Sequence, residues 1–449
     1  MTKVFCPIPL HLINEVNEMN FKKIGNVKFV EGGVCAAKGF KANGIQCGLA
    51  HKPLTSTEEN SAASNNALPS AKKKNDLALI VADKECSAAA VYTTNKVKGA
   101  PILVTNEHIA DGTAKAVIVN SVNANTCNPD GVEKANKMCE LAAAELGLSP
   151  ADIIVASTGV IGQVLPIEPI ANGMKSLVEG LTYDGNSRAL EAIMTTDTQP
   201  KEIAVEFEMG GKTCTMGGML KGSGMIHPNM ATTLTFITTD AAISAEMLQR
   251  ALSDCVKVTL NMASVDGDTS TNDMVCVMAS GTAGNKEVVT EDTDYESFAN
   301  ALYNIMLNLA RMMARDGEGA TKLIECVVSG AAKAETAKIV AKSVICSSLL
   351  KSMIFGEDAN AGRIYCALGY ADADFDISKV DVDMASTGGT IALGRKGCVV
   401  DFSEETAKAV LAEEEIQILI NLGEGNEAAV AWGCDLTYDY VKINGDYRS

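Results

Sequence analysis

A loop broken by glycine and proline, running from Lys221 to Met230, ends just before an apolar, β-branched stretch that begins near Leu234. Two threonines, Thr232 and Thr233, stand at this junction. A turn ahead of a buried strand is the ordinary interpretation of such a loop. The same arrangement would also hold a threonine for self-cleavage. The freed α-amino group, with an ordinary pKa of about 8, is then the nearest base for the threonine hydroxyl.

This junction also constrains how the rest of the chain folds. A cut between Ala231 and Thr232 divides the chain into pieces of 231 and 218 residues. The strand that follows the cut is apolar, so it must be buried between partners from both pieces. We therefore predict that residues 1–231 and 232–449 fold together, and that neither piece is a stand-alone domain.

Short β-branched runs and longer runs with helical spacing alternate along the chain. The predicted strands are residues 77–81, 116–120, 153–156 and 274–278, and the predicted helices are residues 131–148, 241–259 and 294–314. Such alternation is typical of a layered α/β protein, and the length allows two or three average domains or one large unit. The polar segment from about residue 55 to 74 is predicted to be a flexible surface loop.

Composition excludes several classes of protein. The formal net charge of −18 and the lack of basic runs mixed with aromatics argue against nucleic-acid binding. The sequence contains no uninterrupted apolar run of 18 or more residues, so no membrane span is predicted. Residues 1–20 show neither a signal-peptide nor a typical transit-peptide pattern. We expect a cytoplasmic protein, or one of the mitochondrial matrix or plastid in a eukaryote.

The cysteines and histidines do not suggest a metal site. The 14 cysteines are scattered, mostly among apolar residues, with no C-x-x-C pair, and there are only four histidines. Zinc sites usually show clustered ligands at short, regular spacings. Reduced, buried thiols are therefore the favoured interpretation.

Eight ordered motifs extend across most of the sequence. They are Gly32–Phe40, Tyr92–Lys98, Ser157–Gly162, Met194–Thr198, Lys221–Leu234, Val265–Asp273, Asp316–Thr321 and Gly356–Arg363. Together they resemble the ornithine acetyltransferase family, the bifunctional glutamate N-acetyltransferases of arginine biosynthesis, from about residue 28 to residue 449. The resemblance implies a layered α/β sandwich of the self-cleaving N-terminal-threonine type, with interlocked fragments and a smaller C-terminal domain. Self-cleaving aminopeptidases share that fold.

The resemblance assigns the reacting groups. It implies Thr232 as the nucleophile and Ala231–Thr232 as the cleaved bond, although composition alone does not separate Thr232 from Thr233. Thr158 and Gly159 match the oxyanion hole, whose donors must point in advance at the developing negative charge. In isolation, this dipeptide reads as an ordinary turn after a strand.

The resemblance also implies a set of substrate contacts. Lys221 would pair with the substrate α-carboxylate, Glu318 would read its amino group, and Thr195 would make a further contact. Asn444 and Ser449 match the last contacts, near a chain end where fraying is usual. Without the resemblance, Lys221 reads as a solvated surface lysine and Glu318 as a turn residue. The threonine assignment can slip to Thr196 or Thr198 within the same motif.

Some positions depart from the family pattern. Val122 stands where glycine is common, and Ala359 and Ala361 stand where proline and tryptophan are frequent. Ser449 replaces a frequent threonine and keeps the hydroxyl. These changes leave the predicted catalytic positions intact and bear on the finer shape of the substrate pocket.

Three functions compete. In the first, N2-acetyl-L-ornithine acetylates Thr232, ornithine leaves, and L-glutamate takes the acetyl group in a ping-pong reaction. No cofactor is expected, and acetyl-CoA is an alternative donor. Two N-terminal and two C-terminal fragments are expected to assemble. In the second, water is the acceptor, as in an amidohydrolase or aminopeptidase. In the third, the glycine-rich loop 217–224 binds phosphate, but it lacks the phosphate-loop pattern.

Overall fold

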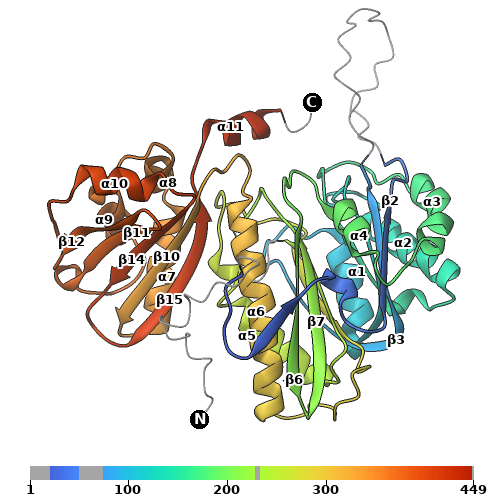
Figure 1. The fold of residues 1–449 in the computed structure, drawn as a ribbon. Coiled ribbons are helices and arrows are strands. Elements are labelled where there is room, and N and C mark those ends of the chain that lie inside the picture. Colours follow the sequence, from blue (N-terminus) through green and yellow to red (C-terminus); the bar gives the residue numbers. More distant parts are fainter. Residues whose placement is uncertain (1–20, 50–73, 228–232, 447–449) are drawn as a thin grey trace, which may run out of the picture.

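The computed structural model describes residues 21–49, 74–227 and 233–446. Within these residues, nine strands form one large sheet in the order β1-β6-β7-β8-β9-β3-β4-β5, and β2 pairs with β3 (Figure 1). The strands are β1 (Val27–Val30), β2 (Phe40–Ile45), β3 (Leu77–Tyr92), β4 (Thr113–Asn120), β5 (Ile153–Ser157), β6 (Lys201–Met209), β7 (Lys212–Lys221), β8 (Leu234–Thr239) and β9 (Met274–Ala279).

The strand β8 joins the two sides of the predicted cut. It pairs antiparallel with β7, with Lys221 opposite Leu234, and parallel with β9, with Leu234 opposite Met274. Strand β9 in turn pairs antiparallel with the second half of β3. Two strands that follow residue 232 therefore lie between β7 and β3, which precede it. Every residue of β8 and β9 is buried, so both faces of this part of the sheet are covered.

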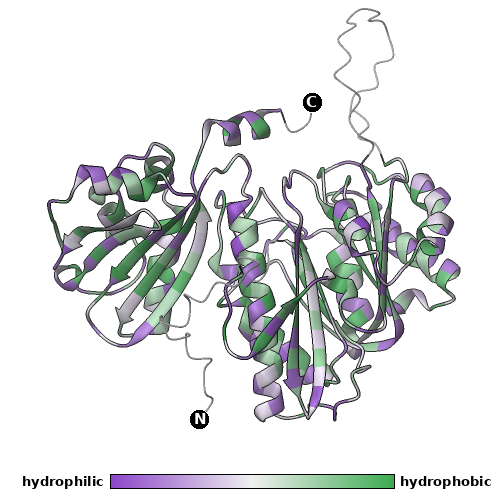
Figure 2. Cartoon of the chain, viewed as in Figure 1, coloured by the Kyte–Doolittle hydropathy of each residue, from purple (hydrophilic) through white to green (hydrophobic). Residues whose placement is uncertain are grey.

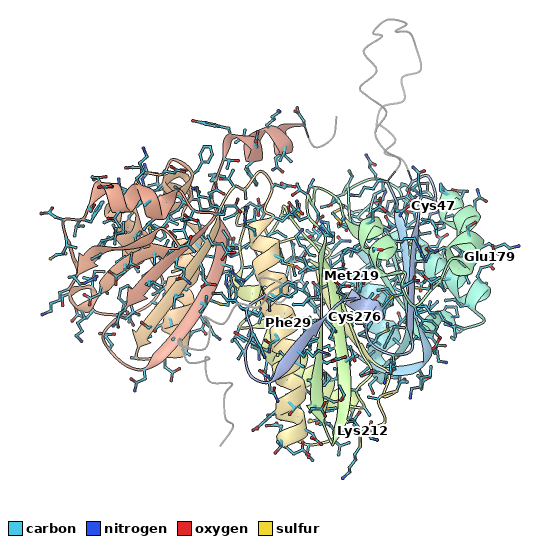
Figure 3. The ribbon with its side chains drawn as sticks, in the orientation of Figure 1. Phe29, Cys47, Glu179, Lys212, Met219 and Cys276 are labelled. Atoms are coloured by element: carbon cyan, nitrogen blue, oxygen red, sulfur yellow. The ribbon has the colours of Figure 1, made fainter. Side chains whose placement is uncertain are left out.

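Helices cover the large sheet on both sides. They are α1 (Ala100–His108), α2 (Gly131–Leu146), α3 (Glu168–Glu179), α4 (Asn186–Ile193), α5 (Ala245–Val256) and α6 (Thr293–Arg315). Helices α5 and α6 pack over one face, on β3 and β6, while α4 packs on β2 and β3. Figure 3 shows Met219 of β7 and Cys276 of β9 inside this packing, with Lys212 and Glu179 projecting outward.

A second sheet lies beside the first and uses only later residues. Its order is β13-β12-β11-β14-β10-β15. The strands are β10 (Leu323–Ala331), β11 (Asp381–Ser386), β12 (Gly389–Arg395), β13 (Cys398–Val399), β14 (Glu415–Asn421) and β15 (Glu427–Cys434). The helices are α7 (Ala334–Cys346), α8 (Ser348–Phe355), α9 (Ala361–Gly369), α10 (Glu404–Leu411) and α11 (Tyr438–Gly445). Apolar residues concentrate on the strands of both sheets (Figure 2).

The predicted layered α/β architecture is confirmed, including a smaller C-terminal unit. The predicted strands and helices are all present, but several boundaries differ: the strand predicted at 77–81 is only the first part of β3, which runs to Tyr92, and the helix predicted over 241–259 is shorter at both ends. The helix predicted from residue 241 begins at Ala245, because Ile243 still bridges to Val288 and the side chain of Ser244 caps the helix by accepting from Met247 N. The predicted loop of residues 55–74 lies outside the described residues except for Lys74.

The described cysteines are free, and most of them are buried or half-buried. Cys127, Cys366 and Cys398 are exposed, so the expectation of buried thiols holds only for the others. Among the helices that the structure describes, none combines the length and apolar character that a membrane span requires.

Candidate active site

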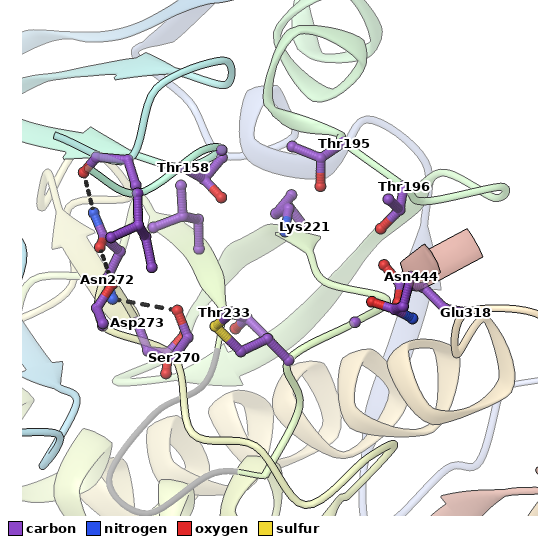
Figure 4. A pocket seen from close by; sticks show the side chains of 17 residues that line it. Thr158, Thr195, Thr196, Lys221, Thr233, Ser270, Asn272, Asp273, Glu318 and Asn444 are labelled. Atoms are coloured by element: carbon purple, nitrogen blue, oxygen red, sulfur yellow. Dashed lines mark hydrogen bonds between the residues drawn. The ribbon is translucent and has the colours of Figure 1, made fainter. Parts of the chain in front are cut away.

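One pocket of about 200 Å³ gathers the predicted site residues that the structure describes (Figure 4). They come from distant parts of the sequence and from different elements. The lining residues include Thr158, Gly159, Thr195, Lys221, Glu318 and Asn444. Three residues predicted to act here, Ala231, Thr232 and Ser449, lie outside the described residues, so their roles stay predictions.

Thr233 is the first described residue after the predicted cut. It lines the pocket and is 4% exposed, and its carbonyl oxygen accepts a hydrogen bond of 2.7 Å from Met274 N. Its hydroxyl shares a 2.6 Å hydrogen bond with the hydroxyl of Thr235. Of the two adjacent threonines, Thr233 therefore already has a structural partner for its hydroxyl, within the strand.

The turn at Thr158 and Gly159 follows β5 at its carboxyl end. Gly159 has a φ of 123°, and a Cβ atom there would lie 2.2 Å from the carbonyl oxygen of Val122. Only glycine fits this close approach without strain. In the described part of the chain, no hydrogen-bond acceptor is recorded for the N–H of Gly159. A backbone donor on a fixed turn is the kind of group that stabilises an oxyanion.

Asn272 joins this turn to the segment that leads into β9. Its side-chain amide donates to the carbonyl oxygens of Ala124 at 2.6 Å and Ser157 at 3.0 Å. Asn272 stands two residues before β9 and is 6% exposed. The C-terminal fragment thus positions the predicted oxyanion turn of the N-terminal fragment.

A buried lysine lies beneath the pocket. The ammonium of Lys201 is 2.7 Å from Asp197 Oδ1 and 2.5 Å from Asp316 Oδ2, and its side chain is 1% exposed. Burial alone would raise the pKa of Asp197, but the charges of Lys201 and Lys221 and the hydrogen bonds from Lys201 and Thr195 hold that pKa below its ordinary value.

The two aspartates paired with Lys201, Asp197 through its carboxylate and Asp316 through its backbone, contact the segments that carry the predicted substrate contacts. Asp197 accepts from Thr195 N at 2.9 Å and from Gly222 N, next to Lys221, at 2.8 Å. The carbonyl oxygen of Asp316 accepts from Ser223 Oγ at 2.6 Å, and Ser223 O accepts from Glu318 N at 3.0 Å. One buried ammonium therefore organises the segments that contain Thr195, Lys221 and Glu318.

Glu318 provides a buried carboxylate at one end of the pocket. It is 6% exposed, and its Oε2 accepts a 2.8 Å hydrogen bond from the side-chain amide of Asn444 on α11. Gly224 makes room for it, since a Cβ atom there would lie 2.2 Å from the carboxyl carbon. A carboxylate whose recorded partner is an amide can still receive a cation. With Lys221 also in the lining, the pocket offers one charge of each sign to a zwitterionic ligand.

The segment just before the predicted cut is held by the loop that follows Val265. The carboxylate of Asp266 accepts from Met225 N at 2.6 Å and from Ile226 N at 2.9 Å. The hydroxyl of Thr269 donates to the carbonyl oxygen of His227 at 2.8 Å. Burial lowers the pKa of His227 to about 4, so its ring is neutral at pH 7. These contacts fix the chain on the N-terminal side of residue 228.

Sequence reasoning missed several residues of the site. Ser270 and Asp273 line the pocket, and Lys201 with its two carboxylates lies below it. The polar motif Val265–Asp273 was a signal for the first two residues. Lys201 is a single lysine at the start of a strand, and nothing in the neighbouring sequence indicated that it is buried. Across the described residues, no group of three or more His, Cys, Asp or Glu side chains is placed to hold a metal ion.

Comparisons with known proteins agree on one family. The ArgJ family model matches residues 62–449. The arginine biosynthesis bifunctional protein ArgJ 1 of Clostridium acetobutylicum is 49% identical over 84% of this chain and 92% of that protein. The ArgJ protein of Caldanaerobacter subterraneus is 43% identical over 94% of this chain and 100% of that protein.

Two solved structures are also similar. A chain of the ArgJ crystal structure from Bacillus halodurans is 47% identical, covers 47% of this chain and 97% of that chain, and has a TM-score of 0.44. A chain of the ornithine acetyltransferase from Mycobacterium tuberculosis, complexed with ornithine, is 32% identical, covers 46% of this chain and 100% of that chain, and has a TM-score of 0.39. The family model matches most of the chain, and relatives at least 43% identical are covered over most of their own length. This chain therefore belongs to the ArgJ family.

Proposed function

We propose that the protein transfers the acetyl group of N2-acetyl-L-ornithine to L-glutamate, with Thr232 as the acetylated residue. The observation that carries this proposal is the pocket itself, whose lining includes a lysine, a carboxylate and a glycine turn for whose N–H the described residues offer no hydrogen-bond acceptor. The names of the relatives, bifunctional proteins of arginine biosynthesis, support the same reaction.

The proposed chemistry begins with the chain cutting itself. The hydroxyl of Thr232 attacks the carbonyl carbon of Ala231, the acyl group moves from nitrogen to oxygen, and water then releases the N-terminal fragment. The contacts of Asp266 to Met225 N and Ile226 N support this step, because they hold the preceding segment while the bond breaks. The product is a threonine with a free α-amine.

In the transfer reaction, the same hydroxyl attacks the acetyl carbon of N2-acetyl-ornithine. The amide bond breaks, the leaving amine takes up a proton, and an acetyl ester remains on Thr232. The N–H of Gly159 and the hydroxyl of Thr158 would stabilise the tetrahedral oxyanion. The amine of glutamate then attacks the ester, N-acetyl-glutamate leaves, and the hydroxyl regains its proton.

The charged groups of the pocket would orient both substrates. Lys221 would hold the α-carboxylate, which N2-acetyl-ornithine and glutamate share. Glu318 would accept the side-chain ammonium of ornithine. The amide of Asn444, which already donates to Glu318, would offer a donor to the side-chain carboxylate of glutamate when ornithine has left.

The test is a product analysis with N2-acetyl-ornithine, with and without glutamate. We expect ornithine and N-acetyl-glutamate in equal amounts when glutamate is present, and at most one acetyl group per enzyme when it is absent. Continued release of acetate without glutamate would instead identify an amidohydrolase on the same fold. A third reaction with acetyl-CoA and glutamate determines whether acetyl-CoA is a second donor.

The fragments are proposed to stay together as two N-terminal and two C-terminal pieces. The place of β8 between β7 and β9 supports the association of one N-terminal with one C-terminal piece. Light scattering on the cut protein measures the assembled mass. A mass of a single pair would contradict the four-piece assembly.

A further inference from the structure

Asp273 brings a second carboxyl group to the pocket, and the hydrogen bonds of the fold do not account for it. It directly precedes β9, lines the pocket and is 3% exposed. Among the described residues, its Oδ2 has no hydrogen-bond partner. A buried polar atom left without a partner costs free energy, so such an atom in a pocket calls for an explanation.

The backbone on both sides of Asp273 is held by neighbouring strands. The carbonyl oxygen of Asp273 accepts from Thr93 N at 3.0 Å, and the next amide, Met274 N, donates to Thr233 O at 2.7 Å. Asp273 is thus fixed between the segments that lead out of β3 and into β8. A carboxyl group on such a fixed segment is pre-organised for chemistry in the pocket.

The surroundings of Asp273 favour its protonated form. Burial raises the pKa of Asp273 well above its ordinary value, and hydrogen bonds from Ser270 and the charge of Lys221 oppose this rise only in part. The charged side chains among the described lining residues are Lys221, Asp273 and Glu318, and of these only Lys221 acts on Asp273. A buried carboxyl group that keeps its proton to higher pH than an ordinary aspartate is the kind of group that serves as a general acid.

The two carboxyl groups of the pocket lie on different sides of it. In Figure 4, Asp273 lies on the side of Thr158, while Glu318 lies on the opposite side with Asn444. In the proposed reaction, the leaving nitrogen is bonded to the acetyl carbon, at the Thr158 turn, and to the Cα atom whose carboxylate Lys221 holds. Asp273 is the carboxyl group on the side of that turn and within reach of the charge of Lys221. Glu318 is left for the far end of the substrate.

We propose that Asp273 is the catalytic acid that gives its proton to the leaving nitrogen of the acetyl donor. The inference rests on the proposed function, which leaves the source of that proton open. The C–N bond of the tetrahedral intermediate breaks, its electron pair stays on nitrogen, and the carboxyl proton passes to that nitrogen. The amine of ornithine leaves and takes one further proton from solvent, while a carboxylate remains on Asp273.

The carboxylate then serves the second half of the reaction. The incoming glutamate carries an ammonium group, which cannot attack the acetyl ester until it loses a proton. The Asp273 carboxylate takes that proton, so the acid is restored and a neutral amine is formed. As the new amide bond forms, the nitrogen loses a second proton to solvent, which balances the proton taken up by ornithine. One carboxyl group thus supplies an acid for one substrate and a base for the other.

The test compares two acetyl donors that differ in the group that leaves. N2-acetyl-ornithine expels an amine, which needs a proton, whereas para-nitrophenyl acetate expels a phenolate that is stable without one. With N2-acetyl-ornithine, the acetylation rate of the wild type should fall as pH rises through the pKa of Asp273, because only the acid form supplies the proton. The aryl ester should lack this basic limb. Acetylation is measured as the mass gain of the C-terminal fragment with time.

The variant is Asp273→Asn, which keeps the shape of the side chain and removes the acid. The matched control is Asp268→Asn, an exposed carboxylate in the same loop. We expect acetylation of Asp273→Asn by N2-acetyl-ornithine to be about 100-fold slower than that of the control, and to lose the basic limb. With para-nitrophenyl acetate, the two variants should agree within about twofold. A merely structural role would slow both donors alike.

Three results would overturn the inference. The first is an equal loss of rate with both donors, and the second is a rate with N2-acetyl-ornithine within about twofold of the Asp268→Asn control. The third is a basic limb in the wild type that is the same for both donors, or one that persists in Asp273→Asn. The wild-type profiles decide without any variant, so a misfolded or uncut Asp273→Asn chain does not prevent the test. Failure of the proposed function is seen separately, as a wild-type protein that is uncut or transfers no acetyl group to glutamate.

Discussion

The two sheets of the molecule differ in how the chain builds them. The six-stranded sheet uses one continuous stretch, residues 323–434, whereas the centre of the nine-stranded sheet joins strands from both sides of the predicted cut. No residue of that stretch lines the pocket in the described structure; Glu318 and Asn444 flank it instead. The smaller sheet thus lies outside the pocket and adjoins two of its segments, while the pocket itself lies where strands from both sides of the predicted cut meet.

The largest expected effect comes from the threonine at the junction. We expect Thr232→Ala to leave one uncut chain in an intact-mass measurement, and acetyl transfer to fall by roughly 10⁴-fold or more, since nucleophile loss removes the covalent route. Thr233→Ala is the matched control, because it removes a hydroxyl already bonded to Thr235. A cut Thr232→Ala beside an uncut Thr233→Ala would move the nucleophile by one residue.

The sequence predicted the layers of the fold because hydrophobic periodicity and β-branched runs are local signals. Strands such as β4 and β9 were found within a few residues of their observed bounds. The motif resemblance selected Thr158, Lys221 and Glu318 from distant positions, and the structure brings them into one pocket. Their roles, like that of Thr232, stay predictions.

The residues that organise the pocket had weaker sequence signals. Lys201 opens a strand and is the kind of residue that usually faces water, yet it is buried between Asp197 and Asp316. Its partners lie 4 and 115 positions away. No local pattern reveals such a pairing, because it depends on how β6 and the end of α6 meet in the folded chain. The unpartnered oxygen of Asp273 is likewise a property of packing.

The next effect concerns the turn that the C-terminal fragment holds in place. We expect Gly159→Ala to lower acetyl transfer by about 100-fold or more, because the added Cβ meets the carbonyl oxygen of Val122 and displaces the oxyanion donor. Gly162→Ala is the control, since Gly162 also has a positive φ but no atom within 4 Å of the added Cβ. The ratio of kcat/KM for the two variants is the measurement. Equal losses would attribute the effect to backbone strain rather than to the donor.

Two buried lysines, one under the pocket and one against the smaller sheet, allow the two regions to be compared directly. Lys201 joins two carboxylates under the pocket, whereas Lys22 pairs with Glu325 on β10 of the smaller sheet at 2.6 Å. Removing either ammonium leaves buried negative charge, so we expect Lys201→Met and Lys22→Met each to lower the free energy of unfolding by about 3–5 kcal/mol. Arg311 lies 3.6 Å from Glu325 and offsets part of its buried charge. We therefore expect the loss of unfolding free energy in Lys22→Met to lie near the lower end of this range.

The effect of each substitution on KM should distinguish the two lysines. We expect Lys201→Met to raise KM about tenfold or more, because the segments of Thr195, Lys221 and Glu318 lose their common anchor. Lys22→Met should leave KM near the wild-type value in the fraction that is folded. Steady-state kinetics below the unfolding temperature measures both. A raised KM in both variants would mean that the smaller sheet shapes the pocket as directly as the interlocked centre does.

The smallest effect is a change in how stability depends on pH. Burial raises the pKa of Asp273, so between the unfolded and folded pKa values the folded chain keeps a proton that the unfolded chain has released. Stability from this group is therefore fully present below the ordinary aspartate pKa of about 4, and is lost as pH rises toward the folded pKa. Asparagine does not titrate. In the uncut Thr232→Ala chain, we expect Asp273→Asn to raise the Tm at pH 8 and to change it little at pH 4.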